Sequence, residues 1–475
     1  MAAVYDIVII GAGPGGYVAA IRASQRGARV ALIEKDRIGG TCLNRGCIPT
    51  KAMMRDAELF RDVASGQFCV DLPGPLAPNF ARLMARKRAV VDGLVGGVAQ
   101  LLSAHRVEVI AGSARLAGPS SVAVTTADEA RTLEARAIIL ATGSVPARVP
   151  IPGTDLPGVV TSNELLEIER LPERLVVVGA SVVGIEFACI FRALGAQVTV
   201  LGRRTFLNSV EPQLARRMQT LLAKRGMAIT IGVEFQAIER SAAGGLAVRY
   251  ARRGQEALAE GDLVLLSTGR APYTEGLGLD EVGVATRGGA VVVGDYLETS
   301  VPGIYAIGDC TGRYYLAHVA SYEAEVAVEN ILAADRGAGE RRAADHRVVP
   351  NCVFTIPEIA GVGLSEEEAK AAGLDVRVTR FPFNVNGRAL AMGEPEGLVR
   401  LLCERLPDGT GGRVVGVHIL GPRASDLIAE AALAMRLGAT AQDIAQTIHA
   451  HPTVPEALME AAMGQSLGAI HYRQI

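Results

Sequence analysis

The sequence predicts an α/β fold with two similar parallel-sheet units followed by a C-terminal α+β module. Three observations carry this prediction. A glycine-rich turn follows a buried strand near the N-terminus, and the same pattern returns near the middle of the chain. The last 130 residues or so alternate strand-like and helical stretches without such a turn. The length of 475 residues allows roughly three domains.

The first glycine-rich turn joins a strand to a helix. Residues 6–10 form an apolar run rich in β-branched side chains, as in a buried parallel strand, and a turn over 11–16 follows. Helical spacing over 17–26 leads to a second strand that ends at Glu34. Such a turn brings backbone N–H groups close to a phosphate, and a carboxylate after the second strand accepts hydrogen bonds from ribose hydroxyls. The alternative is an ordinary glycine turn with Glu34 as a surface charge.

The same pattern returns in the middle of the chain. A strand is predicted over 174–178, a turn over 179–184 and a helix over 185–194. Gly11 and Glu34 are 23 positions apart, and so are Gly179 and Gly202. This repeat is stronger evidence than either turn alone, and it predicts two Rossmann-like dinucleotide-binding units.

The second turn departs from the usual pattern at two positions. Ser181 replaces the middle glycine and adds a small side chain near the expected phosphates, and Gly202 replaces the ribose-binding acid. Arg203 and Arg204 follow, and their guanidinium groups could pair with the 2′-phosphate of NADP. Alternatively, both arginines are solvated and NAD binds without the acid. A glutamate at position 202 is expected to shift the preference toward NAD, because it would repel a 2′-phosphate.

Composition and charge exclude several classes of protein. Lys and Arg total 48 and Asp and Glu total 50, so the net charge of −2 gives no reason to expect nucleic acid as a partner. Seven cysteines in a chain of this length are no secreted disulfide framework, and no apolar run is long enough to predict a membrane span. The segment before the first strand is too short for a signal peptide, so the cytoplasm is the simplest location.

Two cysteines lie five positions apart in the segment 39–51. On an ideal helix such Cα atoms are about 8–9 Å apart, whereas a disulfide requires less than about 7 Å. Pairing of Cys42 with Cys47 would therefore need a distorted helix, and Gly46 is the expected place. Outside secreted proteins a dithiol is more often catalytic than structural. Two unrelated thiols or a zinc pair are the alternatives, but no second Cys/His pair has ligand spacing and no metal site is predicted.

The segment 39–51 resembles the redox-active disulfide segment of the flavin-dependent pyridine nucleotide–disulfide oxidoreductases. The resemblance covers essentially the whole chain, through motifs that are weak singly and highly specific together. These further motifs are Ala141-Thr142-Gly143-Ser144, Ser267-Thr268-Gly269-Arg270-Ala271-Pro272, Tyr305-Ala306-Ile307-Gly308-Asp309, Leu316-Ala317-His318, Phe381-Pro382-Phe383 with Asn386-Gly387-Arg388-Ala389, and His449-Ala450-His451-Pro452-Thr453. Tyr273 departs from the family, which usually has Asn there.

The resemblance implies three domains and a homodimer. A discontinuous FAD-binding domain would comprise residues 1–149 and 271–345, with an NAD(P)-binding domain over 150–270 and a dimerisation domain over 346–475. Stretches rich in Pro and Gly near 146–157 and 269–272 fit the two crossings between the first two domains, and a stretch of small and charged residues over 334–346 resembles a linker.

The implied cofactors are FAD and either NAD or NADP. Glu34 would bind the adenosine ribose of FAD, and Asp309 would bond a ribityl hydroxyl. The other positions expected to bind the two cofactors are Gly11, Gly13, Gly16, Lys35, Thr41, Lys51, Thr142, Gly143, Leu316, Ala317, His318, Gly179, Ser181, Gly184, Arg203, Arg204, Gly269 and Arg270.

The resemblance also assigns catalytic roles. Cys42 would exchange with substrate and Cys47 would face the flavin. Lys51 would lie beside the flavin ring and pair with Glu186, since an ammonium stabilises a reduced, anionic ring and a buried ammonium requires a carboxylate partner. The alternative for Glu186 is a surface acid on a helix.

Thiol–disulfide exchange also requires a group that takes and returns a proton. His451 with Glu456 matches the acid–base pair of the family, where the histidine comes from the other subunit and the active site is shared. His449, two residues earlier, is the competing candidate, and the family pattern selects the histidine that precedes proline.

Within the family, the stretches 44–46, 316–318 and 383–390 are most similar to members that oxidise dihydrolipoyl groups. The expected reaction passes electrons from a dihydrolipoyl group, through the dithiol and FAD, to NAD(P), with a lipoyl-carrying protein as partner. An NAD(P)H-dependent reductase of another disulfide, as in glutathione reduction, or of a metal ion, as in mercuric reduction, is the alternative. The C-terminal stretch 468–475 has no cysteine, unlike the mercury-reducing relatives. The third alternative is a non-enzymatic flavoprotein, a structural subunit or redox sensor that binds FAD but shows little turnover.

Overall fold

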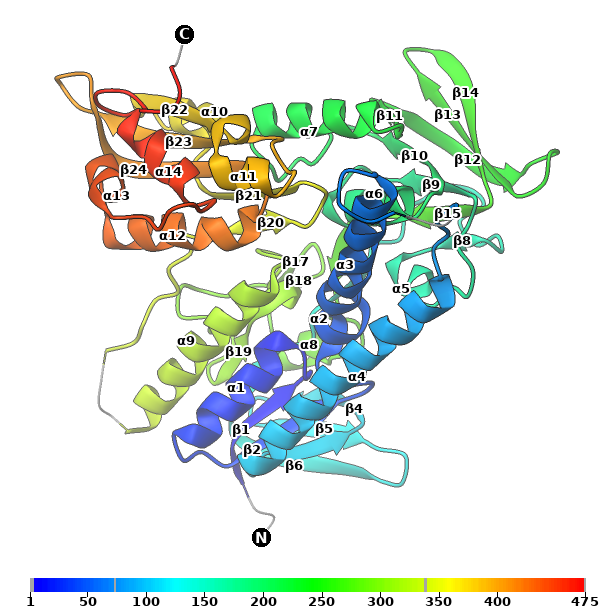
Figure 1. The fold of residues 1–475 in the computed structure, drawn as a ribbon. Helices are drawn as coiled ribbons and strands as arrows, with labels where there is room; N and C mark the ends of the chain where they lie inside the picture. Colours follow the sequence, from blue (N-terminus) through cyan, green and yellow to red (C-terminus); the bar gives the residue numbers. More distant parts are fainter. Residues whose placement is uncertain (1–3, 72–73, 337–339, 474–475) are drawn as a thin grey trace.

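The computed structural model describes residues 4–71, 74–336 and 340–473. Three bodies of sheet and helix are visible in Figure 1, and they confirm the predicted fold class. The strands expected at the two glycine turns are present, at Tyr5–Ile10 and Arg174–Val178. Among the described residues, no helix is long and apolar enough to cross a membrane.

The first unit contains a sheet in the order β3-β2-β1-β6-β5-β4, with β19 also paired to β6. The pairs of β1 with β2 and β6 are parallel, so the carboxyl ends of these three strands lie in a row. Its main elements are β1 (Tyr5–Ile10), α1 (Pro14–Gln25), β2 (Val30–Glu34), α2 (Gly40–Arg45), α3 (Cys47–Ala64), α4 (Phe80–Ala104), β3 (Glu108–Ala111), β4 (Ser113–Gly118), β5 (Ser121–Thr125), β6 (Ala130–Leu140), β19 (Ile304–Ala306), η1 (Gly308–Thr311) and α9 (Ala317–Arg336).

The second unit repeats this plan with a parallel sheet in the order β11-β10-β9-β15-β8. An antiparallel meander, β12-β13-β14, accompanies it, as β4-β5-β6 accompanies the first unit; the glycine-turn repeat did not predict these meanders. The elements are β8 (Val159–Val160), α5 (Ser162–Leu165), β9 (Arg174–Val178), α6 (Val182–Ala193), β10 (Gln197–Gly202), α7 (Pro212–Lys224), β11 (Ala228–Ile231), β12 (Glu234–Arg240), β13 (Leu246–Arg252), β14 (Gln255–Gly261) and β15 (Leu263–Leu266).

The chain enters and leaves the second unit through one small ribbon. β7 (Ser144–Pro146) pairs with β16 (Arg270–Pro272) in antiparallel register. β16 lies within the stretch 269–272 expected as a crossing, and β7 ends at the first residue of the stretch 146–157. The chain then returns to the first unit with β19 and α9. Because α9 continues to Arg336, the segment expected to be a linker from 334 begins later than predicted, and its residues 337–339 lie outside the described residues.

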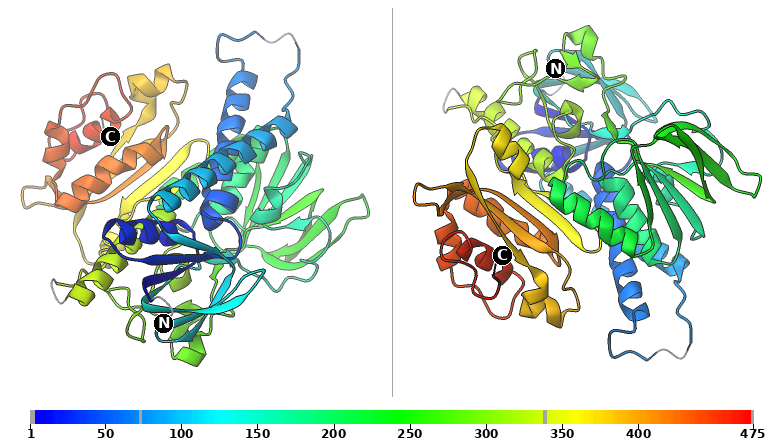
Figure 2. Two further views of the ribbon diagram at one scale, coloured as in Figure 1. Left: turned by 90° about the horizontal axis from the view of Figure 1, so that it is seen from below. Right: turned by 90° about the horizontal axis from the view of Figure 1, so that it is seen from above.

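The C-terminal body is an antiparallel sheet with helices beside it, and both views of Figure 2 show it next to the other two units. The strand order is β20-β21-β24-β23-β22, and α12 and α14 pack against this sheet. The elements are β20 (Asn351–Val353), β21 (Glu358–Gly363), α10 (Glu366–Ala371), β22 (Val376–Pro382), α11 (Gly387–Ala391), β23 (Leu398–Arg405), β24 (Gly411–Gly421), α12 (Ala424–Leu437), α13 (Ala441–Gln446) and α14 (Glu456–Met463).

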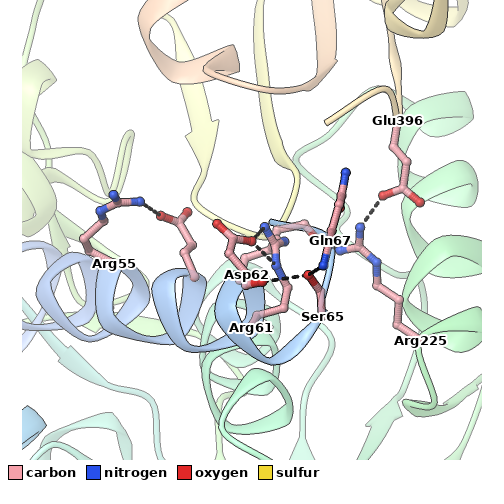
Figure 3. A network of polar contacts seen from close by, with 9 residues as sticks. Arg55, Arg61, Asp62, Ser65, Gln67, Arg225 and Glu396 are labelled. Carbon is pink, nitrogen blue, oxygen red and sulfur yellow. Dashed lines mark hydrogen bonds and ion pairs between the residues drawn. The ribbon is translucent and has the colours of Figure 1, made fainter. Parts of the chain in front are cut away.

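Helix α3 runs from the cysteine segment to the junction of all three units. Its Met53 and Met54 are buried in the core of the second unit, in the same cluster as Ile356 of the C-terminal body. Figure 3 shows the last turns of α3 beside Arg225 and Glu396, which form an ion pair between α7's end and the C-terminal body. The helix that begins at one cysteine is therefore fixed along its length by the other two units.

A buried arginine joins the C-terminal sheet to α7. Arg400 is 1% exposed, and its Nη1 atom lies 3.3 Å from Oε1 of the buried Glu211, while Nη2 donates to Glu366 at 2.6 Å. Alternate residues of β23 face opposite sides of the sheet, so Val399 and Leu401 pack in the C-terminal core while Arg400 points the other way.

We predict that Arg400→Ala lowers the thermal unfolding midpoint strongly, because it leaves Glu211 buried without a cation, a loss of about 3–5 kcal/mol. The double variant Arg400→Met with Glu211→Gln should recover most of the midpoint, since the carboxylate that still loses its cation, Glu366, has a side chain that is 46% exposed. Calorimetry of the three proteins tests this. A double variant no more stable than Arg400→Ala would contradict it.

Candidate active site

The two cysteines of the segment 39–51 lie on either side of a break between two helices. Cys42 is in α2 and Cys47 is the first residue of α3, with Gly46 at φ −141° and ψ −104° between them. The helix is thus interrupted at the residue where the sequence predicted a distortion. A Cβ at Gly46 would lie 3.1 Å from the Thr41 carbonyl oxygen, so the break favours glycine. Buried Thr50 fixes the first turn of α3 by donating to the Gly46 carbonyl at 2.7 Å.

The two thiols differ in acidity. A hydrogen bond with Cys42, aided by the Lys51 ammonium, lowers the pKa of Cys47 to about 7, although burial opposes this. The same hydrogen bond and burial raise the pKa of Cys42 above its ordinary value. Cys47 also lies at the N-terminus of α3, where the helix dipole favours negative charge. In the reduced state the arrangement favours a thiolate on Cys47 and a proton on Cys42.

Lys51 is held by groups from the two other units. Its Nζ atom lies 2.8 Å from Oε2 of Glu186, whose side chain is 6% exposed on α6. Oε1 of Glu186 accepts from the backbone N–H of Phe354 at 2.9 Å, and the Phe354 ring lies 4.3 Å from the ammonium. Glu186 is therefore not a solvated surface acid. The ammonium is directed by a carboxylate and an aromatic ring one turn of α3 from Cys47.

The first glycine turn leaves room for a dinucleotide. A Cβ at Gly16 would lie 1.7 Å from the Gly11 carbonyl oxygen, so turn and helix are in close contact there. At Gly13 a Cβ would meet nothing nearer than 4.0 Å, which leaves the N-terminus of α1 open to a phosphate group. Glu34 ends β2 beside this opening, and its carboxylate accepts from the Ala12 and Asp36 N–H groups at 2.7 and 2.9 Å. The residues present fit an FAD adenosine diphosphate.

Asp309 belongs to a chain of polar contacts near the end of β6. Ser144 donates to Asp309 at 2.5 Å and accepts from Nε of Arg270 at 2.7 Å. Burial raises the pKa of Asp309, and the Ser144 hydrogen bond and the Arg270 charge oppose the rise. Gly143 and Gly269 both have positive φ and open space where a Cβ would be. The structure therefore brings Asp309 to the chain that follows β6, 165 residues earlier in the sequence.

The remaining positions expected at FAD lie around this region. Thr41 is in α2, and Thr142 donates to the Tyr273 carbonyl at 2.6 Å. Leu316, Ala317 and His318 lie at the start of α9, where the exposed His318 contacts the Pro350 carbonyl at 2.9 Å.

The second glycine turn is compact. A Cβ at Gly179 or Gly184 would lie within 2.3 Å of an oxygen of Ser267, so both positions require glycine. Ser181 donates its hydroxyl to the Ser267 carbonyl at 2.8 Å. The side chain that the sequence placed near the phosphates is thus held by the end of β15, and it adds no hydroxyl donor free for a ligand.

Position 202 is constrained by packing as well as by charge. A Cβ at Gly202 would lie 2.5 Å from Cδ1 of Ile231 and 2.9 Å from the Ala180 Cβ atom. A glutamate there would displace both neighbours, so Gly202→Glu alone does not isolate the charge effect expected from the sequence. Arg203 and Arg204 are exposed, and neither pairs with an acid within the described part of the chain.

The two candidate histidines differ in their surroundings. His449 has a side chain 6% exposed and is held by Glu430 at 2.9 Å. His451 is 79% exposed, and its Nδ1 atom lies 2.9 Å from Oε1 of Glu456. Glu456 is in turn oriented by the Thr453 N–H at 2.8 Å, and although burial alone would raise its pKa, the bonds to Thr453 and His451 lower it. Nε2 of His451 is thus available to a group from outside the chain, and neither cysteine contacts it here.

Some contacts at the site were not predicted from the sequence. Phe354 and Ser144 both touch predicted residues, yet neither was selected. Ser144 is the last residue of the motif at 141–144, and its place in that motif was a signal that it lies near the cofactor, whereas Phe354 gives no local signal. Within the described ranges, no group of three or more His, Cys, Asp or Glu side chains is arranged to hold a metal ion.

Comparisons with known proteins find matches over almost the whole chain. The family model described as pyridine nucleotide-disulphide oxidoreductase matches residues 5–324, and the dimerisation domain of that family matches residues 349–462. The dihydrolipoyl dehydrogenase of Bacillus subtilis is 38% identical and covers 99% of this chain and 100% of its own. Dihydrolipoyl dehydrogenase 3 of Pseudomonas aeruginosa is 41% identical over 97% of both chains.

Solved structures have the same fold. LpdA of Mycobacterium tuberculosis superposes with a TM-score of 0.86 at 30% identity, covering 97% of this chain and 99% of that one. The copper(II) complex of RclA, a hypochlorous acid-induced flavoprotein disulfide reductase of Escherichia coli, gives 0.85 at 28% identity, with the same coverage.

We predict that alkylation of the reduced protein by iodoacetamide is fastest at Cys47 and that its rate rises through a midpoint near pH 7. The thiolate forms as the pH passes the pKa, which is about 7. Lys51→Met should move the midpoint upward, because the ammonium lowers that pKa, whereas Arg55→Met, on the same helix, should leave it in place. Peptide mapping of alkylated protein at several pH values gives the measurement. Faster modification of Cys42 would contradict the assignment.

Proposed function

Because the chain belongs to the pyridine nucleotide-disulphide oxidoreductase family and its Bacillus subtilis and Pseudomonas aeruginosa relatives are dihydrolipoyl dehydrogenases, we propose that it oxidises the dihydrolipoyl group of a carrier protein to the lipoyl disulfide. The chain is a flavoprotein disulfide oxidoreductase that uses FAD and a nicotinamide dinucleotide. The observation that carries the proposal is the dithiol at Gly46, with its acidic Cys47 directed by Lys51 and Glu186.

In the proposed reaction, a thiol of the substrate attacks Sγ of Cys42 in the Cys42–Cys47 disulfide. His451 takes the proton of that thiol, and Cys47 leaves as a thiolate stabilised by Lys51. The second substrate thiol then gives its proton to Cys42 by way of His451 and attacks the substrate sulfur bound to Cys42. The bond from that sulfur to Cys42 breaks, Cys42 leaves as a thiol, and the lipoyl disulfide is released while the dithiol keeps the electron pair. Glu34 and Asp309 would hold FAD, with Lys51 beside its ring, and the bound flavin would supply the redox link between this dithiol and NAD(P).

We place the proton acceptor in the other subunit of a homodimer, with residues 346–475 as the dimerisation domain. His451 is exposed and aligned by Glu456, yet it contacts neither cysteine of its own chain. Such an arrangement supports a site completed by a second copy. FAD would lie on residues 1–149 and 271–345, and NAD(P) on 150–270.

The partner we propose is a protein or domain that carries a lipoyl group. We also propose a cytoplasmic location, because a dithiol that cycles between reduced and oxidised states operates where thiols are kept reduced.

Cys47→Ser should abolish oxidation of dihydrolipoamide while FAD stays bound, because the serine hydroxyl cannot form the disulfide that accepts the electrons. The matched control is Cys69→Ser, an exposed cysteine outside the site, which should keep wild-type turnover. Steady-state rates with NAD and with NADP, together with the flavin absorbance of each protein, give the answer. Turnover by the Cys47→Ser variant would refute the dithiol assignment. If the wild-type protein reduces glutathione disulfide or copper(II) and does not oxidise dihydrolipoamide, the proposed substrate is wrong.

The exposed pair Arg203–Arg204 bears on the choice between NAD and NADP, because guanidinium groups there could pair with the 2′-phosphate of NADP. Each charge-assisted hydrogen bond to a phosphate contributes about 1.5–3 kcal/mol, so changing both arginines to Gln should lower kcat/KM for NADP by roughly ten- to a hundredfold and change that for NAD little. The control is the same change at Arg252 and Arg253, another exposed adjacent pair. If the ratio of the two kcat/KM values is unaltered, Arg203 and Arg204 are solvated charges that do not bind the 2′-phosphate.

A further inference from the structure

Lys35 and Tyr273 meet across the first glycine turn. Lys35 directly follows β2, and Tyr273 directly follows β16. The Nζ atom of Lys35 lies 3.6 Å from the centroid of the Tyr273 ring, a cation–π contact between two segments that are far apart in the sequence. Lys35 is exposed and Tyr273 is half-buried, so the pair lies at the surface of the first unit.

The position of Tyr273 is set by its backbone. Its N–H donates to the Gly143 carbonyl at 2.9 Å, and its carbonyl accepts from Thr142 Oγ1 at 2.6 Å. Thr142 and Gly143 follow the end of β6. The ring is therefore carried by the chain at the carboxyl end of β6, and a change of its side chain leaves both of these bonds in place.

The strand order places the Lys35–Tyr273 contact over the carboxyl end of β1. β1 lies between β2 and β6, with Ile10 opposite Ile33 on one side and opposite Leu140 on the other. A contact between the segment after β2 and the segment held after β6 must cross the end of β1, where the turn with Gly13 begins. In a doubly wound sheet the dinucleotide binds in the crevice at this end of the strands.

We propose that Lys35 and Tyr273 form a strap over the adenosine diphosphate part of bound FAD and slow its release. The proposal rests on the assignment of FAD to the first glycine turn. The ammonium has no carboxylate partner within the described part of the chain, so its charge is available to the pyrophosphate while the ring holds its position. Tyr273, the residue that departs from the family pattern, supplies the aromatic half of the contact.

The test is the rate at which FAD leaves the purified holoenzyme, followed by the rise in flavin fluorescence after dilution. Tyr273→Ala and Lys35→Met should each speed release by roughly two- to fivefold, the range of an exposed cation–π contact. Because Lys35→Met also removes the charge available to the pyrophosphate, the double variant should be no faster than Lys35→Met. Tyr273→Phe keeps the ring and should release FAD at the wild-type rate.

The control is Tyr296→Ala, which removes a similar contact with Arg341, at 4.6 Å, elsewhere in the same unit. It should leave release unchanged. Release rates of Tyr273→Ala and Lys35→Met equal to the wild-type rate would overturn the strap. Faster binding of FAD by the FAD-free variants, with an unchanged release rate, would also overturn the strap. In that case Lys35 and Tyr273 would occupy the place of FAD. The assay contains no dihydrolipoyl substrate, so its outcome is independent of whether the proposed reaction is correct.

Discussion

The ion pair between Lys51 and Glu186 is the contact on which the site depends. Lys51 belongs to the helix that begins at Cys47, Glu186 belongs to α6 of the second unit, and Phe354, which donates to the same carboxylate, belongs to the C-terminal body. A carboxylate as buried as Glu186 is stable as an ion only with a cation and hydrogen-bond donors beside it. The three units must therefore be docked correctly for this charge to be satisfied, and the same docking places an ammonium beside the dithiol.

The break at Gly46 gives the two cysteines different surroundings within six residues. Cys47 lies at a helix N-terminus near a cation, while Cys42 lies in the preceding short helix and holds its proton. One thiol is thus suited to carry negative charge and the other to exchange with a substrate. The asymmetry arises from backbone geometry and from Lys51.

Much of the fold could be predicted from local patterns, because strand, glycine turn and helix follow each other directly in the chain. The two central strands and the interruption near Gly46 are of this kind. Contacts between distant segments could not be read without knowledge of the family: Ser144 meets Asp309 across 165 residues, and Phe354 meets Glu186 across 168. At Gly202 the sequence shows only that the usual ribose-binding acid is absent, which is a difference in charge. The structure adds that Ile231 and Ala180 pack where a side chain would lie.

The ribbon of β7 and β16 has an evolutionary consequence. The two strands pair directly, so the points where the chain enters and leaves the second unit lie about one strand spacing apart, near 5 Å. Because the two crossing points are neighbours, the second unit can be replaced by another of the same kind without any change in the backbone of the first unit. With NAD(P) placed in this unit as proposed, the preference for one dinucleotide can change along a lineage, provided that Glu186, which holds Lys51, is kept.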